Sequence, residues 1–105
     1  MSDVLGHPGG GASFEGFVVE NLLATLPDAA APWFYRTSAG AEVDLAIEQG
    51  TRLRIAVDIK RTSTPRVGKG FHQGCEDIRA THRFLVYSGQ ERFPLTHDVI
   101  ALYPR

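Results

Sequence analysis

Cysteine and long apolar runs are what this chain of 105 residues has least of. A single cysteine, Cys75, excludes an internal disulfide framework and is typical of proteins in a reducing, cytoplasmic setting. No apolar run approaches the roughly 20 residues that a membrane-spanning helix needs. The first residues also lack the basic start and apolar centre of a signal peptide. We therefore expect a cytoplasmic protein that does not enter a membrane.

A dominant charge of one sign is also missing, since the formal net charge is only −1. The hydrophobic content of 43% and the charged content of 22% are ordinary for a globular protein and too apolar for a disordered one. The length allows one domain with a modest core, so we treat residues 1–105 as a single domain with a glycine-rich lead-in over 1–12. No Gly-Lys-Ser/Thr follows these glycines, and a Walker-type phosphate loop is therefore not expected.

Positive charge nevertheless gathers in one stretch of the chain. Between residues 52 and 69 the only carboxylate is Asp58, and the basic residues are Arg52, Arg54, Lys60, Arg61, Arg66 and Lys69. Such an excess can neutralise the phosphates of a nucleic acid. The alternative is a solvated edge strand and loop, where basic side chains discourage pairing with another chain.

Hydrophobic periodicity predicts two helices and five strands. The first helix is expected over 14–26, capped by Ser13, with a buried stripe of Phe14, Phe17, Val18 and Leu22. The second is expected over 70–81, with Phe71, Cys75 and Ile78 on one side. Strands are predicted over 33–37, 42–48, 53–61, 83–88 and 99–103.

The order of these elements predicts the layers of the domain. The first three strands can form an antiparallel meander, and the following strand-helix-strand unit adds a parallel pair with a right-handed crossover. We therefore expect a three-layer α/β domain, with a mixed central sheet of about five strands flanked by two helices.

The hairpin over 42–61 carries the chemistry. Alternation places Val43, Leu45 and Ile47 on one face and Asp44, Ala46 and Glu48 on the other. Ala56, Asp58 and Lys60 share the second face from the next strand. The small alanines would let a helix approach closely, and the turn brings Asp44 opposite Asp58 and Lys60, with a register that the sequence does not fix.

Two carboxylates and an ammonium gathered in this way suit a divalent cation and a phosphodiester. Asp44 and Asp58 could bind Mg²⁺ or Mn²⁺ directly, with the main-chain carbonyl of Ile59 completing the set and Glu15 reaching the metal through water. Lys60 could orient the attacking water or stabilise charge on the phosphoryl group. The alternative is a set of cross-strand ion pairs that contributes little at a surface.

The order of a helical acid, a strand aspartate and an Asp-x-Lys triplet resembles the PD-(D/E)XK nuclease superfamily. One branch is closer: the blocks at 11–18, 35–37, 40–44, 58–61, 70–72, 75–77 and 86–87 resemble a C-terminal domain of unknown function that follows the motor module of many prokaryotic AAA-type ATPases. The resemblance implies a restriction-endonuclease-like fold with Glu15, Asp44, Asp58 and Lys60 at the nuclease positions. Asp58 departs from that branch, which usually has glutamate there.

The leading functional hypothesis is therefore Mg²⁺-dependent hydrolysis of nucleic acid. Arg36, Glu42 and Arg61 would support the site, Arg36 and Glu42 either by pairing with each other or by lining its rim. His72 could touch phosphate or be a solvated helical histidine. The alternatives are a catalytically silent interaction module, which docks onto an AAA-type ATPase or forms a homodimer, and DNA binding without cleavage.

Overall fold

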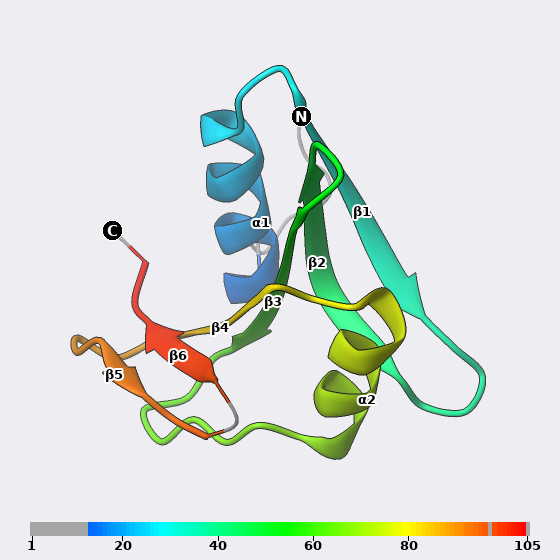
Figure 1. Ribbon diagram of the computed structural model, residues 1–105. Helices are drawn as coiled ribbons and strands as arrows, with labels where there is room; N and C mark the ends of the chain where they lie inside the picture. Colours follow the sequence, from blue (N-terminus) through cyan, green and yellow to red (C-terminus); the bar gives the residue numbers. More distant parts are fainter. Residues whose placement is uncertain (1–12, 97, 105) are drawn as a thin grey trace.

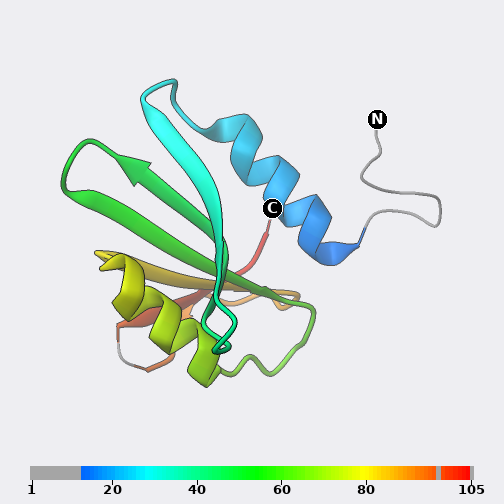
Figure 2. The same cartoon turned by 90° about the vertical axis from the view of Figure 1, so that its right-hand side faces the viewer.

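The computed structural model describes residues 13–96 and 98–104, so the glycine-rich lead-in expected over 1–12 lies outside the described residues (Figure 1). A mixed sheet is covered by one helix on each face, as the sequence predicts (Figure 2). No helix in this part of the chain is long and apolar enough to cross a membrane. The elements in chain order are α1 (Phe14–Thr25), β1 (Ala30–Arg36), β2 (Glu42–Gln49), β3 (Leu53–Lys60), α2 (Lys69–Ile78), β4 (His82–Tyr87), β5 (Phe93–Pro94) and β6 (Val99–Leu102).

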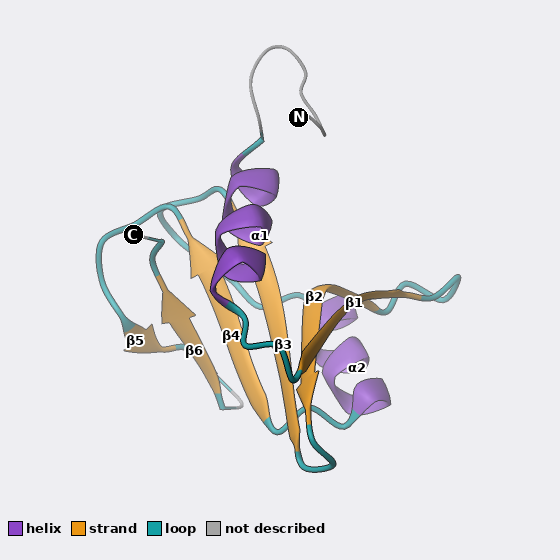
Figure 3. Ribbon diagram, turned by 90° about the horizontal axis from the view of Figure 1, so that it is seen from above, coloured by secondary structure: helices purple, strands orange, loops and turns teal. Residues whose placement is uncertain are grey.

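The described residues form a six-stranded sheet in the order β1-β2-β3-β4-β6-β5 (Figure 3). The first three strands are an antiparallel meander, and β3, β4 and β6 run parallel, with α2 as the connection from β3 to β4. The meander and the parallel pair β3–β4 were expected, whereas the second parallel pair, β4–β6, was not predicted. The strand β5 was not predicted either, because its two residues include Pro94 and carry no alternation, and such a short strand is tolerated at an edge. The strand β1 begins at Ala30, before the predicted residue 33, because an edge strand also tolerates Pro32.

The helix α1 begins where the sequence predicts. The Ser13 side chain accepts a hydrogen bond from the Gly16 N–H (N···O 2.9 Å), and the helix ends before Pro27. The buried stripe, however, does not include Phe17, which is 47% exposed. The residues facing the sheet are Phe14, Val18, Val19, Leu22 and Leu26. The stripe extends from Val18 to the side that carries Val19, so Phe17, about 100° to the other side of Val18, is turned toward solvent.

The helix α2 is shorter than predicted, ending at Ile78 rather than at residue 81. Arg79 adopts a left-handed backbone conformation (φ 56°), and the Ala80 N–H donates to the Cys75 carbonyl (2.9 Å). This end leaves Thr81 outside the helix, where its N–H donates to the carbonyl of Arg54 at the start of β3 (2.7 Å). The predicted contact residues Phe71, Cys75 and Ile78 are buried against the sheet.

A β-bulge in β2 corrects the predicted alternation of the hairpin. Trp33 pairs with Ala46 and Tyr35 pairs with Val43, so Phe34 alone opposes the two residues Asp44 and Leu45. The extra residue shifts the phase of β2 by one position. Val43 therefore packs on the α2 side with Ala46 and Ala56, whereas Leu45 and Ile47 face α1. The prediction that Val43 shares a face with Leu45 and Ile47 was wrong for this reason.

Candidate functional site

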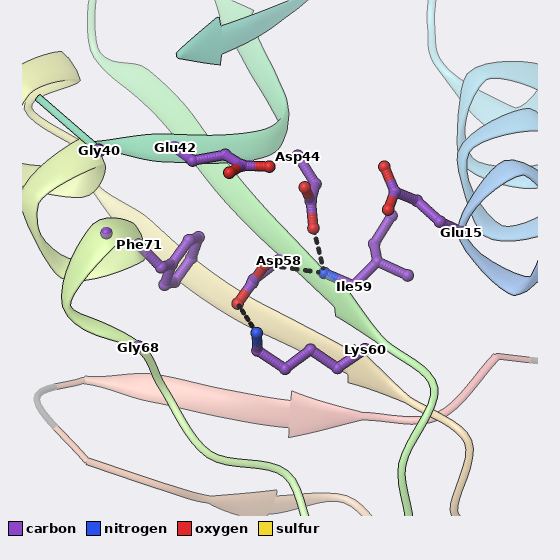
Figure 4. Close-up of a pocket in the computed structure, with 10 residues that line it drawn as sticks. Glu15, Gly40, Glu42, Asp44, Asp58, Ile59, Lys60, Gly68 and Phe71 are labelled. Carbon is purple, nitrogen blue, oxygen red and sulfur yellow. Dashed lines mark hydrogen bonds and ion pairs between the residues drawn. The ribbon is translucent and has the colours of Figure 1, made fainter. Parts of the chain in front are cut away.

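A pocket of about 300 Å³ lies where β2 begins and β3 ends (Figure 4). Its polar side chains come from α1, β2 and β3, and its remaining wall comes from Gly40 and the start of α2. The lining residues are Glu15, Gly40, Glu42, Asp44, Asp58, Ile59, Lys60, Gly68, Gly70 and Phe71. All four residues predicted for the nuclease positions are thus brought together.

One backbone amide holds both aspartates. The Ile59 N–H donates to Asp44 Oδ2 (2.8 Å) and to Asp58 Oδ1 (3.2 Å). The second oxygen of Asp58, Oδ2, lies 3.7 Å from Lys60 Nζ. The pairing of β2 with β3 stops at Leu45–Val57, and Asp44, which precedes Leu45, lies in the bulge. Asp44 is therefore outside the regular ladder and can reach the Ile59 amide.

Negative charge is crowded in this pocket. Asp58 is the buried charged residue of the described chain, at 7% exposure. The pKa of Asp44 is raised to about 7, first by burial and then by its interaction with Asp58, and the Ile59 amide offsets this only in part. Near neutral pH the Asp44 carboxyl is therefore partly protonated. A cation placed between the two aspartates would remove the cause of that shift.

Glu15 reaches the pocket from the first turn of α1 (Figure 4). Burial raises its pKa, the neighbouring charges of Asp44 and Glu42 raise it further, and Arg36 acts in the opposite direction. The prediction had placed Glu15 near the metal ligands from sequence order alone, and the structure puts it in electrostatic contact with one of them.

The predicted supporting residues separate into two groups. Arg36 and Glu42 pair with each other at 3.0 Å, and Glu42 also lines the pocket. Arg61 follows β3 and is exposed, and His72 is half-buried in α2; neither belongs to the pocket lining.

The basic stretch of the sequence is also divided by the fold. Arg52 lies in the hairpin turn and Arg54 at the start of β3, at the other end of the strand from Lys60. Arg54 Nη2 lies 3.3 Å from Glu48 Oε2. Of the basic residues in the stretch, only Lys60 lines the pocket.

Two glycines of α2 that the sequence analysis did not single out bring this helix against the site. A Cβ atom at Gly70 would lie 2.5 Å from the Gly40 carbonyl oxygen, and one at Gly74 would lie 2.7 Å from Val43 Cγ2. The helix can therefore touch the start of β2 only without side chains at these positions. Their spacing of four residues, which puts them on one helix face, was the available signal.

The donor set can be tested against a divalent cation. Within residues 13–96 and 98–104, no three His, Cys, Asp or Glu side chains form a metal-binding group. Mg²⁺, however, keeps several waters and is commonly held by one or two carboxylates. Asp44 and Asp58 share one amide and supply such a pair. The residues therefore fit a hydrated Mg²⁺ or Mn²⁺ and do not form a complete protein cage.

Comparison with known proteins places the chain in a family. The uncharacterized proteins Mb2031c of Mycobacterium bovis and Rv2008c of Mycobacterium tuberculosis are each 41% identical to it over 97 residues. The matched region covers 91% of this chain and 21% of each relative, so the chain spans about a fifth of their length. No solved structure matches it. The family described as Domain of unknown function (DUF4143) matches residues 10–104, nearly the whole chain, and the protein therefore belongs to the DUF4143 family.

Proposed function

We propose that this domain is a Mg²⁺-dependent nuclease of the PD-(D/E)XK type with a restriction-endonuclease-like fold. The observation that carries the proposal is the convergence of Asp44, Asp58 and Lys60 at one pocket, with both aspartates on the Ile59 amide. The order of one helix, a three-stranded meander, a second helix and a parallel strand supports the fold assignment.

Asp44 and Asp58 would hold the cation, and Glu15 would contact it through water. The Ile59 carbonyl would also be a ligand of the cation. The amide and the carbonyl of one strand residue point toward the same neighbouring strand, and the Ile59 amide points toward Asp44. When bound, the cation supplies charge neutralisation and a more acidic water for hydrolysis of the phosphodiester.

The chain's own residues perform the remaining tasks. The Lys60 ammonium, next to Asp58 and open to the pocket, can stabilise the negative charge that builds on the phosphoryl oxygens. Asp44, whose pKa is about 7 without a metal, would stay ionised as a ligand once a cation offsets the charge of Asp58. Glu15 adds negative charge on the α1 side of the pocket and favours a cation there.

A second candidate function is a catalytically silent module that binds nucleic acid, docks onto an AAA-type ATPase or pairs with a second copy. The contacts of Asp58 favour it, because this carboxylate already has Lys60 and the Ile59 amide as partners. A carboxylate neutralised in this way can be retained without a metal. The relatives are also more than four times as long as this chain, which leaves room for such a docking partner within one protein.

Calorimetric titration with Mn²⁺ tests the proposal without a guess about the substrate. The comparison is between the wild-type chain, Asp44→Asn, Asp58→Asn and the control Glu48→Gln. Glu48 lies on the same strand as Asp44 but pairs with Arg54 outside the pocket. We expect saturable binding in the wild-type chain and the control, and at least a tenfold loss in each Asp→Asn variant.

Binding with that pattern justifies nuclease assays on DNA and RNA with Mg²⁺ or Mn²⁺, which should lose activity in the same two variants. Equal Mn²⁺ affinity in all four proteins, or no binding at millimolar Mn²⁺ in the presence of nucleic acid, contradicts the metal site. It then favours the silent module.

A further inference from the structure

Phe34 stands out among the aromatic residues of the described chain. Its side chain is 68% exposed, although it lies in the middle of β1 between two aromatic neighbours that are packed. Trp33 and Tyr35 contact the α2-side core, and the Tyr35 hydroxyl donates to Asp77 Oδ2 (2.8 Å). Because successive side chains of a strand alternate, Phe34 points to the other face of the sheet, where α1 does not cover it.

The exposed Phe34 ring lies next to the candidate functional site. Phe34 is the residue opposite the bulge at Asp44 and Leu45. It lines a second cavity of about 320 Å³, which shares Glu15, Glu42 and Asp44 with the carboxylate pocket. A single exposed aromatic is common on protein surfaces. This one forms a wall of the space next to the predicted metal ligands.

Cations as well as carboxylates surround this space. Arg36 lies two residues beyond Phe34, lines the same cavity, and pairs with Glu42 at 3.0 Å while its side chain is 76% exposed. Lys60 lines the neighbouring carboxylate pocket, and the chain continues from it into the basic loop that ends at Lys69. Each cavity thus has one cation among its carboxylates, and a divalent cation bound there would supply further positive charge for a polyanion.

We propose that Phe34 is a stacking platform for an unpaired base of a single-stranded nucleic acid whose backbone crosses the carboxylate pocket. The inference rests on the proposed nucleic-acid function and adds the substrate class. An exposed ring next to cations is the usual arrangement for single strands, since every base has a face to stack. A base inside a duplex has both faces covered by its neighbours and gains nothing from such a ring. The substrate class is therefore single-stranded or locally unpaired DNA or RNA.

Fluorescence anisotropy with labelled oligothymidylate, oligouridylate and a DNA duplex of equal length tests the inference. Ca²⁺ replaces Mg²⁺, the metal proposed to support hydrolysis, so that binding is measured separately from cleavage. We expect Phe34→Ala to weaken binding of the single strands by about 5- to 100-fold and Phe34→Trp to restore it. The two homopolymers separate DNA from RNA. The control is Phe17→Ala, which removes an exposed aromatic of α1 that lies outside both cavities.

Three outcomes overturn the inference: no binding of either single strand by the wild-type chain, unchanged binding by Phe34→Ala, or an equal loss for duplex and single strands. In the second of these cases, a self-association that disappears in Phe34→Ala would assign the ring to contact with a second copy. Mn²⁺ affinity should not change in Phe34→Ala. If the wild-type chain neither binds Mn²⁺ nor cleaves, but the selective loss in Phe34→Ala holds, hydrolysis is refuted and the stacking platform stands.

Discussion

The two ends of the β2–β3 hairpin differ in how their charged side chains are paired: opposite charges meet at the turn and like charges at the open end. At the turn, where Gly50 adopts a positive φ of 67°, Glu48 and Arg54 face each other across the strands and pair at 3.3 Å. Arg54 is further tied to the end of α2 through the Ile78 carbonyl (3.2 Å). At the open end, Asp44 and Asp58 meet on one amide, with Glu42 and Glu15 nearby.

The difference indicates which end is shaped by folding and which by function. Opposite charges across a ladder stabilise a sheet slightly, and like charges destabilise it. The turn end follows that rule. The open end violates it, and burial adds to the effect by raising the pKa of Asp44. Clusters of carboxylates that oppose stability are concentrated at functional sites, and this contrast can be broken or sharpened by mutation.

The largest expected effect comes from removing the Lys60 ammonium at the open end of the hairpin. Lys60→Met should lower the proposed nuclease activity by at least about 100-fold, because it removes a positive charge from the proposed site of phosphodiester hydrolysis. Mn²⁺ affinity should stay the same or increase, since Asp58 loses its competing ion pair. Arg54→Met, which removes the cation at the turn, is the matched control and should leave activity unchanged. Equal rates for the two variants would contradict the role of Lys60.

The next effect is steric. Gly74→Ala places a Cβ atom 2.7 Å from Val43 Cγ2 and 3.1 Å from the Glu42 carbonyl oxygen, so α2 and the start of β2 must separate. We expect a loss of about 1–3 kcal/mol in the free energy of unfolding, measured by urea denaturation. Gly68→Ala is the control in the same helix region, because its Cβ would meet nothing within 4 Å. It should change the free energy by less than about 1 kcal/mol, mainly through the helix cap.

The pH dependence of stability should differ between the two ends. The pKa of Asp44 is about 7 in the folded chain and 3.8 in its ordinary state. Its proton-linked stabilisation is therefore complete below about pH 4 and is lost as the pH rises through about 7. Allowing for solvent screening of this partly exposed group, we expect the wild-type chain to lose about 1–2 kcal/mol relative to Asp44→Asn between these limits. Urea denaturation across this range without metal measures the loss. Glu48→Gln should retain the wild-type profile.

The smallest effect belongs to the turn. Glu48→Gln removes an ion pair between half-exposed side chains and should change the free energy of unfolding by less than about 0.5 kcal/mol. Thermal unfolding at low and high salt measures the difference, which should shrink as salt increases. A loss above 2 kcal/mol would place a structural ion pair at the turn and remove the contrast between the two ends.

Local chemistry made much of this fold predictable. Ser13 and Pro27 mark the ends of α1, the alternation over β2 and β3 predicts a half-buried hairpin, and the order of elements predicts the meander and the parallel pair. The site residues were predictable because a hairpin must bring its two open ends together. The bulge was not, since it arises from the mismatch between β1 and β2 and leaves no mark in either strand alone.

Tertiary contacts decided the remaining differences. The exposure of Phe17 depends on where α1 lies over the sheet, whereas its helical spacing alone predicts a buried position. The helix α2 ends early because Arg79 adopts a left-handed backbone conformation, which the sequence Arg-Ala-Thr does not predict. The close contacts of Gly70 and Gly74 become visible only when a partner strand is placed beside them.

Cys75 lets the opening of α2 be measured without an engineered label. It is the one cysteine of the chain, it is 0% exposed, and burial raises the pKa of its thiol to about 11. Alkylating reagents attack the thiolate, so the native chain reacts only when α2 lifts from the sheet. The same helix forms one wall of the carboxylate pocket through Gly70 and Phe71. Anything that binds there should therefore slow alkylation, and the rate of a simple thiol reaction reports occupancy of the site for ligands that have no signal of their own.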